Sequence, residues 1–217
     1  MRAVIFDMDG VIIDSEPMYN KIHADMLRDF GITKFLDSPE DYTGMTSTAV
    51  FTATKELYQL KQSVAVLAAY QRATILQEIN KLHDEPIDGI RDLLIALKAQ
   101  KIKTAIASSS ERTFINAVID KFDLHDYFDV IVSGDDINHS KPAPDIFLKA
   151  AKHLSVVPGD CLVIEDSKNG TIAAKAANMQ CIGFANPNSG NQDLSRADKI
   201  VSCIREIDVD NIVRSML

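Results

Sequence analysis

The chain has 217 residues, 46% of them hydrophobic and 25% charged, which is the composition of a globular protein with one large domain or a core plus a smaller insert. A formal net charge of -8 argues against nucleic acid or an anionic membrane as the main binding partner. The N-terminal apolar run is too short for a signal peptide and no later run reaches transmembrane length, so we expect a cytoplasmic protein, with no obligate protein partner evident.

The first predicted element is a short strand over residues 3–6, and it ends at the stretch Asp7-Met8-Asp9-Gly10-Val11. Carboxylates spaced i and i+2 at the end of a strand point the same way, and the glycine behind them allows a sharp turn. Two like charges held this close need a cation or a shared proton. The opening strand therefore predicts an acidic site.

Residues 15–83 contain no convincing strand and are predicted to be all-helical. Apolar residues recur at every fourth position of the first helix, and Asp14 or Ser15 is expected to cap it. The predicted helices of this block cover residues 17–30, 49–60 and 64–82.

From residue 86 onward, short apolar strands alternate with amphipathic helices. The strands are predicted at residues 103–107, 129–132, 161–164, 181–184 and 199–201, and the helices at 90–98, 111–122, 144–154, 168–177 and 204–216. Ser110 is expected to be the N-cap of the second of these helices. This alternation predicts a parallel sheet covered on both faces, in which ligands bind beyond the carboxyl ends of the strands.

The residues that follow the predicted strands are rich in oxygen ligands and include one lysine. Beyond Asp7 and Asp9, these residues are Ser108, Ser109, Lys141, Glu165 and Asp166. Clustered carboxylates without histidine or cysteine favour Mg²⁺. The cation and Lys141 can neutralise a phosphoryl group, to which Ser108 would donate a hydrogen bond. Asp7 is then the candidate nucleophile, and Asp9 the candidate acid that protonates the leaving oxygen.

These stretches resemble the four motifs of the haloacid dehalogenase superfamily, in order and in context. The matching positions are Asp7-Met8-Asp9-Gly10-Val11, Ser108, Lys141 within Ser-Lys-Pro-Ala-Pro-Asp, and Glu165-Asp166 within Glu-Asp-Ser-x-x-Gly. The resemblance implies an α/β fold: a Rossmann-like, doubly wound parallel sheet core, residues 1–14 and 84–217, with an inserted all-helical cap domain, residues 15–83. It also implies that Mg²⁺ is held by Asp7, the backbone carbonyl of Asp9 and Asp166, with Glu165 a ligand or a neighbour of one.

The resemblance favours a Mg²⁺-dependent phosphatase that acts on a small phosphorylated metabolite, most simply a sugar phosphate. Dehalogenases of the family lack the second aspartate, which is present here as Asp9. A β-phosphoglucomutase remains an alternative, although Tyr19 occupies the position of its cap histidine and the loop at 44–48 has no arginine. A non-catalytic binding protein on the same fold is the third interpretation.

The expected substrate contacts divide between the core and the cap. Core residues expected to bind phosphate are Gly10, Ser108, Ser109 and Lys141. The cap candidates for the rest of the substrate are Lys21, His23, Thr46 and Arg72. His23 lies one turn beyond Tyr19 on the same predicted helix and is the residue that keeps the mutase alternative open.

Overall fold

A computed structural model of the chain describes residues 1–36, 47–82 and 85–214. The described residues form a six-stranded parallel sheet in the order β3-β2-β1-β4-β5-β6. The strands are β1 (Ala3–Phe6), β2 (Lys103–Ala107), β3 (Val130–Val132), β4 (Cys161–Glu165), β5 (Gln180–Phe184) and β6 (Lys199–Val201). The strand order confirms the predicted doubly wound α/β fold.

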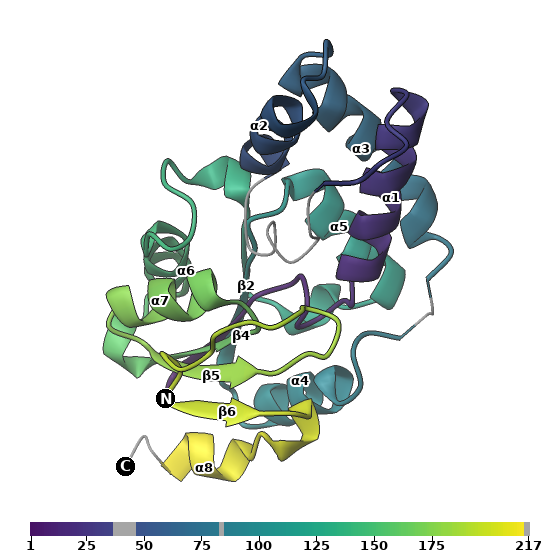
Figure 1. Cartoon of the computed structure of the whole chain (residues 1–217). Coiled ribbons are helices and arrows are strands. Elements are labelled where there is room, and N and C mark those ends of the chain that lie inside the picture. Colours follow the sequence, from purple (N-terminus) through teal and green to yellow (C-terminus); the bar gives the residue numbers. More distant parts are fainter. Residues whose placement is uncertain (37–46, 83–84, 215–217) are drawn as a thin grey trace.

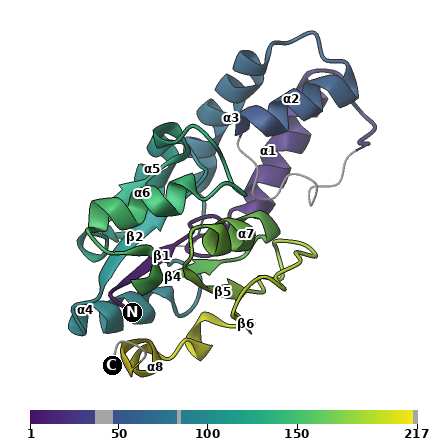
Figure 2. The same cartoon turned by 90° about the vertical axis from the view of Figure 1, so that its left-hand side faces the viewer.

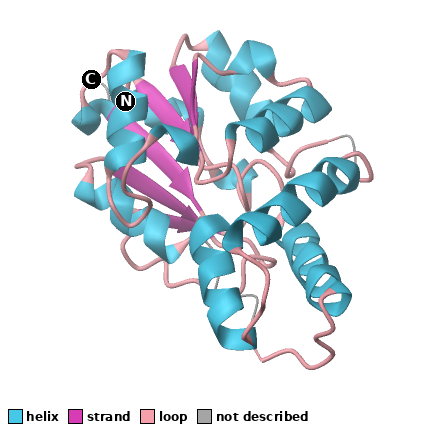
Figure 3. Cartoon of the chain, turned by 90° about the horizontal axis from the view of Figure 1, so that it is seen from above, coloured by secondary structure: helices cyan, strands magenta, loops and turns pink. Residues whose placement is uncertain are grey.

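Helices cover both faces of the sheet, as Figure 3 shows around the magenta strands. Because successive strand residues point to opposite faces, Val4 and Phe6 pack in one hydrophobic cluster and Ala3 and Ile5 in another. The first cluster includes residues of α4 (Ile90–Ala99), α5 (Arg112–Phe122) and α8 (Val209–Arg214). The second includes residues of α6 (Asp145–Leu154) and α7 (Lys168–Ala176). Alternation along each strand thus fixes which helices lie on which face.

Three helices inserted between β1 and α4 form the helical cap. They are α1 (Glu16–Asp29), α2 (Ser47–Tyr58) and α3 (Val64–Ile79), and Figures 1 and 2 show them grouped at one end of the molecule, away from both termini. Met26 and Leu27 pack with α2 and α3 in a hydrophobic cluster of their own. Met18 and Ile22, near the start of α1, belong instead to the main cluster that reaches the sheet. The start of α1 therefore anchors the cap on the core.

Several local predictions are wrong. The helix expected over 204–216 is a short 3-10 turn, η5 (Ile204–Glu206), followed by α8. Ser15 stands at the N-cap position of α1 but its side chain makes no capping hydrogen bond, and Glu111, not Ser110, is the N-cap of α5. The other 3-10 turns within the described ranges are η2 (His125–Tyr127), η3 (Gly134–Asp136) and η4 (Pro158–Asp160). No helix in the described ranges is long and apolar enough to cross a membrane.

The sheet topology brings two sets of acidic residues together. β1 pairs with β2 on one side and with β4 on the other, and the strand order reverses at this point. Ligands of open parallel sheets bind in the crevice outside the carboxyl ends of strands at such a switch point. Asp7 directly follows β1 and Glu165 ends β4, so their carboxylates meet in that crevice.

Candidate active site

A buried lysine joins the carboxylates at the ends of β1 and β4. Lys141 Nζ lies 2.7 Å from Asp7 Oδ1 and 2.6 Å from Glu165 Oε1, and the lysine side chain is 2% exposed. Burial alone would lower the pKa of Lys141, but the two carboxylates outweigh it and raise the pKa, so the ammonium stays charged. Ser167 donates to Glu165 Oε2 from both its amide and its hydroxyl. Glu165 thus accepts hydrogen bonds on both carboxylate oxygens, from Lys141 and from Ser167, and it holds the lysine next to Asp7.

Three buried acids lie close enough to share one cation. Asp7, Glu165 and Asp166 each bring a carboxylate oxygen within 4.8 Å of the others. Burial raises the pKa of Asp7 to about 8 against the opposing charge of Lys141, and repulsion from Glu165 and Asp9 adds to the rise. Burial also raises the pKa of Asp166. Carboxylates buried together with too little positive charge fit a hard divalent cation.

Two glycines make room for this acidic cluster. A Cβ at Gly10, where φ is +76°, would lie 1.9 Å from Asp166 Oδ2. A Cβ at Gly170 would lie 1.7 Å from Glu165 Oε1. Any side chain at either position would displace a carboxylate. Gly10, expected to bind phosphate, thus lies directly against a carboxylate of the acidic cluster.

The carboxylate of Asp9 lies outside the acidic cluster and has its own set of hydroxyl partners. Ser15 Oγ donates to Asp9 Oδ1 at 2.7 Å, while Ser108 Oγ and Ser110 Oγ donate to Asp9 Oδ2 at 3.1 and 2.8 Å. These contacts describe how both serines differ from the capping predictions: each hydroxyl is directed at Asp9, and neither caps the first turn of its helix. The hydroxyl of Ser108, expected to face a phosphoryl group, here faces Asp9. Coordination of a metal by the backbone carbonyl of Asp9 stays a prediction.

Ser109 contributes a buried hydroxyl next to this network. Its Oγ has no hydrogen-bond partner among the described residues. The backbone at this point is tightly packed, since a Cβ on Gly134 would lie 2.2 Å from the Ser109 carbonyl oxygen. A buried hydroxyl without a partner is costly and favours a polar ligand at this position.

The loop after β5 contributes two site residues that the sequence patterns did not indicate. Ser189 Oγ donates to Asp166 Oδ2 at 2.5 Å, and Asn186 Nδ2 donates to the carbonyl oxygen of Gly10 at 2.9 Å. Ser189 thereby holds an acid of the cluster, and Asn186 holds the turn behind Asp9. The rule that located the other site residues, inspection of the residues after each strand, would have found this loop as well.

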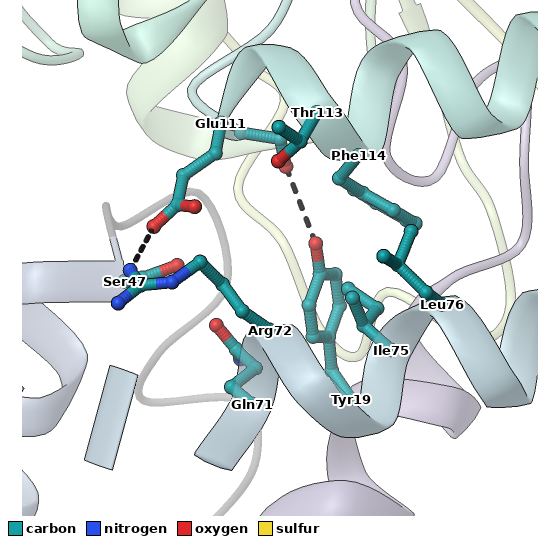
Figure 4. Close-up of a pocket in the computed structure, with 10 residues that line it drawn as sticks. Tyr19, Ser47, Gln71, Arg72, Ile75, Leu76, Glu111, Thr113 and Phe114 are labelled. Atoms are coloured by element: carbon teal, nitrogen blue, oxygen red, sulfur yellow. Dashed lines mark hydrogen bonds and ion pairs between the residues drawn. The ribbon is translucent and has the colours of Figure 1, made fainter. Parts of the chain in front are cut away.

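A pocket of about 160 Å³ opens between the cap and the N-terminus of α5 (Figure 4). Tyr19 of α1 points its hydroxyl toward α5, 3.2 Å from Ser110 Oγ, and its ring packs edge-on against Phe114. Burial, followed by the charge of Asp9, raises the pKa of Tyr19, so its hydroxyl stays neutral. Since Ser110 also binds Asp9, a chain of hydrogen bonds leads from the pocket to the candidate acid.

The structure brings one of the four cap candidates to this pocket. Arg72 lines it and lies 2.9 Å from Glu111 at the start of α5. Lys21 is exposed and pairs with acids of the cap itself. His23 is half-buried on α1 and is not among the described residues that line the pocket. Thr46 lies outside the described residues.

Comparison with known proteins identifies the family. The family model of the haloacid dehalogenase-like hydrolases matches residues 4–184. The phosphorylated carbohydrates phosphatase of Thermotoga maritima is 31% identical over 95% of this chain and 100% of its own. Hexitol phosphatase B of Escherichia coli is 30% identical over 97% of this chain and 96% of its own.

A solved structure supports the same grouping. The β-phosphoglucomutase of Clostridium difficile superposes with a TM-score of 0.87 at 27% identity, over 99% of this chain and 96% of the other. The match extends across the sheet and the helical cap, and it agrees with the family resemblance of the four motifs. The chain is therefore an enzyme of the haloacid dehalogenase-like hydrolase family, in the subgroup of sugar phosphatases and β-phosphoglucomutases with a helical cap.

Proposed function

We propose that the enzyme is a Mg²⁺-dependent phosphatase that hydrolyses a small phosphorylated metabolite, most simply a sugar phosphate, through an aspartyl-phosphate on Asp7. The observation that carries this proposal is the buried contact of Lys141 with Asp7 and Glu165. Asp166 lies in the same acidic cluster, and Asp9 follows Asp7 by two residues. The names of the relatives, a phosphatase of phosphorylated carbohydrates and a hexitol phosphatase, support the substrate class.

The acidic cluster fits Mg²⁺ because it offers only oxygen ligands at the described positions and has one ammonium, Lys141, against three carboxyl groups. Asp7, Asp166 and the backbone carbonyl of Asp9 are the proposed ligands, and Ser189 orients Asp166. When bound, the cation neutralises phosphate oxygens and the repulsion among the acids. Glu165 acts by holding Lys141, since both of its oxygens accept other hydrogen bonds.

Asp7 and Asp9 divide the chemistry of the two steps. One carboxylate oxygen of Asp7 attacks phosphorus, and the bond between phosphorus and the ester oxygen breaks. Asp9 gives its proton to that leaving oxygen. Asp9 then takes a proton from water, which attacks the aspartyl-phosphate, releases inorganic phosphate and restores the Asp7 carboxylate. Lys141 and Ser109 bind phosphate oxygens during both steps.

Residues 15–83 are proposed as the cap domain, and residues 1–14 and 84–217 as the core. Closure of the cap excludes water while the leaving group is still present, and opening admits the water that completes the reaction. Two cap residues contact the core near the start of α5. Tyr19 binds Ser110, and Arg72 pairs with Glu111. They mark the surface at which the cap and the core meet over the substrate.

A screen for phosphate release from phosphorylated metabolites, with and without Mg²⁺, tests this function. The screen includes β-glucose 1-phosphate with a hexose bisphosphate primer, because the β-phosphoglucomutase neighbour makes a mutase the second candidate. We expect Mg²⁺-dependent release from sugar or sugar-alcohol phosphates. Isomerisation of glucose 1-phosphate without release of phosphate would reverse this assignment in favour of a mutase. Absence of both turnover and metal binding would support a non-catalytic binding protein instead.

A further inference from the structure

The pocket beside Asp9 contains one pair of opposite charges that face each other. Among the described residues that line it, Arg72 is the only cation and Glu111 the only carboxylate. Arg72 Nη1 lies 2.9 Å from Glu111 Oε1, and Figure 4 shows the two side chains reaching toward each other from α3 and from the start of α5. Both are partly exposed, with 49% and 31% of their side chains accessible, so a substrate can reach them.

The pocket is placed to receive the leaving group of the ester. Ser110 lines the pocket and donates to Asp9 Oδ2, the carboxylate proposed to protonate the leaving oxygen. Tyr19 binds Ser110 from the cap side. An ester whose leaving oxygen lies at Asp9 therefore extends its remaining atoms toward Tyr19, Arg72 and Glu111. The volume of about 160 Å³ leaves room for a small leaving group only.

The rest of the described lining is neutral. Ser47, Gln71 and Thr113 add hydroxyl and amide groups, and Ile75 and Phe114 supply apolar surface. Such groups can exchange hydrogen bonds with the hydroxyls of a sugar or a sugar alcohol. The segment 37–46, which lies outside the described residues, contains no lysine, arginine or histidine and therefore adds no positive side chain wherever it lies.

A second phosphate in this pocket would meet a cation that is already neutralised. Arg72 could bind a phosphate as a bidentate partner only by giving up Glu111, whose carboxylate would then lie unpaired next to the incoming negative charge. The pairing of Arg72 with Glu111 thus disfavours a dianionic group at the far end of the substrate.

We propose that Glu111, by pairing with Arg72, restricts this enzyme to monophosphate esters whose leaving group is a neutral polyhydroxyl chain, and excludes bisphosphates. The inference rests on the phosphatase function proposed above. It also separates the two candidate functions, because a phosphomutase must bind a sugar bisphosphate as its intermediate. Glu111 is thus the residue that selects substrates by the charge of their leaving group.

The test compares kcat/KM for a hexitol monophosphate and a hexose bisphosphate in the wild type, Glu111→Gln and the double variant Glu111→Gln/Arg72→Gln. We expect the wild type to prefer the monophosphate. Glu111→Gln should shift the ratio toward the bisphosphate by about tenfold or more, the effect of one charge-assisted hydrogen bond. The double variant should lose that shift. Glu85→Gln is the matched control, since it breaks an exposed pair with Arg91, 2.8 Å long, outside the pocket.

Two outcomes overturn the inference alone, and a third overturns it together with the proposed phosphatase function. A wild type that hydrolyses both substrates equally well would contradict it. So would a Glu111→Gln variant that folds, as judged by its circular dichroism and Tm, but keeps the wild-type ratio. Para-nitrophenyl phosphate, which has no polyhydroxyl chain, reports the chemistry alone. If the wild type releases no phosphate even from that ester, the phosphatase function itself fails, and with it the inference.

Discussion

Replacing the proposed nucleophile should make the metal-free protein more stable while removing its activity. In Asp7→Asn, the amide oxygen still accepts from Lys141, but one of three buried carboxylates that share a single ammonium is gone. The folded-state pKa of Asp7 is raised from 3.8 to about 8, so folded Asp7 holds a proton that the unfolded chain releases. Its contribution to stability is present below about pH 4 and is lost as the pH rises through about 8.

The size of this effect follows from the same shift. Each pKa unit corresponds to about 1.4 kcal/mol, and coupling among the acids reduces the full value, so we expect a gain of about 2 kcal/mol or more at neutral pH. Urea unfolding in the presence of a chelator, at about pH 5 and about pH 8, measures it. The wild type should lose more stability than Asp7→Asn between the two pH values. Asp126→Asn, at an exposed position on η2, is the matched control.

Addition of Mg²⁺ should make the wild type more stable than Asp7→Asn, because a cation that binds Asp7 stabilises the wild type more than the variant. The reasoning is refuted if Asp7→Asn is less stable than the wild type at both pH values without metal. It is also refuted if both proteins show the same dependence on pH.

Three further changes test the other parts of the site. Asp9→Asn should slow the hydrolysis of esters with poor leaving groups much more than that of activated esters; an equal loss for both would exclude proton donation by Asp9. Ser189→Ala removes the hydroxyl that holds Asp166 and should weaken Mg²⁺ affinity by about 10–100-fold, with turnover restored at high Mg²⁺. A loss that Mg²⁺ does not restore would contradict that role. Gly10→Ala should cost more than about 1 kcal/mol and most activity, whereas Gly159→Ala, with open space around its Cβ, should change stability by less than about 0.5 kcal/mol. Equal unfolding free energies for the two variants would argue against the close packing at Gly10.

The order of strands and helices was predictable because periodicity is a local property of the sequence. Each described strand of the sheet consists mostly of apolar residues, and each helix of the core carries an apolar stripe. The placement of the acidic cluster followed from one further rule, that the carboxyl ends of parallel strands meet at one edge. Asp7, Lys141 and Glu165 come together for that reason, although 134 residues separate the first two.

Side-chain partners were harder to predict, since they depend on which residues the fold brings near one another. Ser15 and Ser110 have the residue type and position of helix caps, yet both donate to Asp9. The pairing of Arg72 with Glu111 joins two helices from different parts of the chain, and no spacing in the sequence indicates it. Ser189 lies in the loop after β5, where no acidic motif in the sequence marks a site, and only the fold brings it to Asp166. Local pattern thus specifies elements, and tertiary contact decides which polar groups meet.

The central claim is that Asp7 carries the phosphoryl group during turnover, and rapid quenching followed by peptide mass spectrometry tests it most directly. The experiment uses Asp9→Asn with an activated ester and Mg²⁺, because this variant should form the aspartyl-phosphate but activate water poorly. We predict the mass of one added phosphoryl group on the peptide that contains Asp7, and none in Asp7→Asn. Turnover without a phosphorylated peptide, or with the group on another residue, would contradict the account.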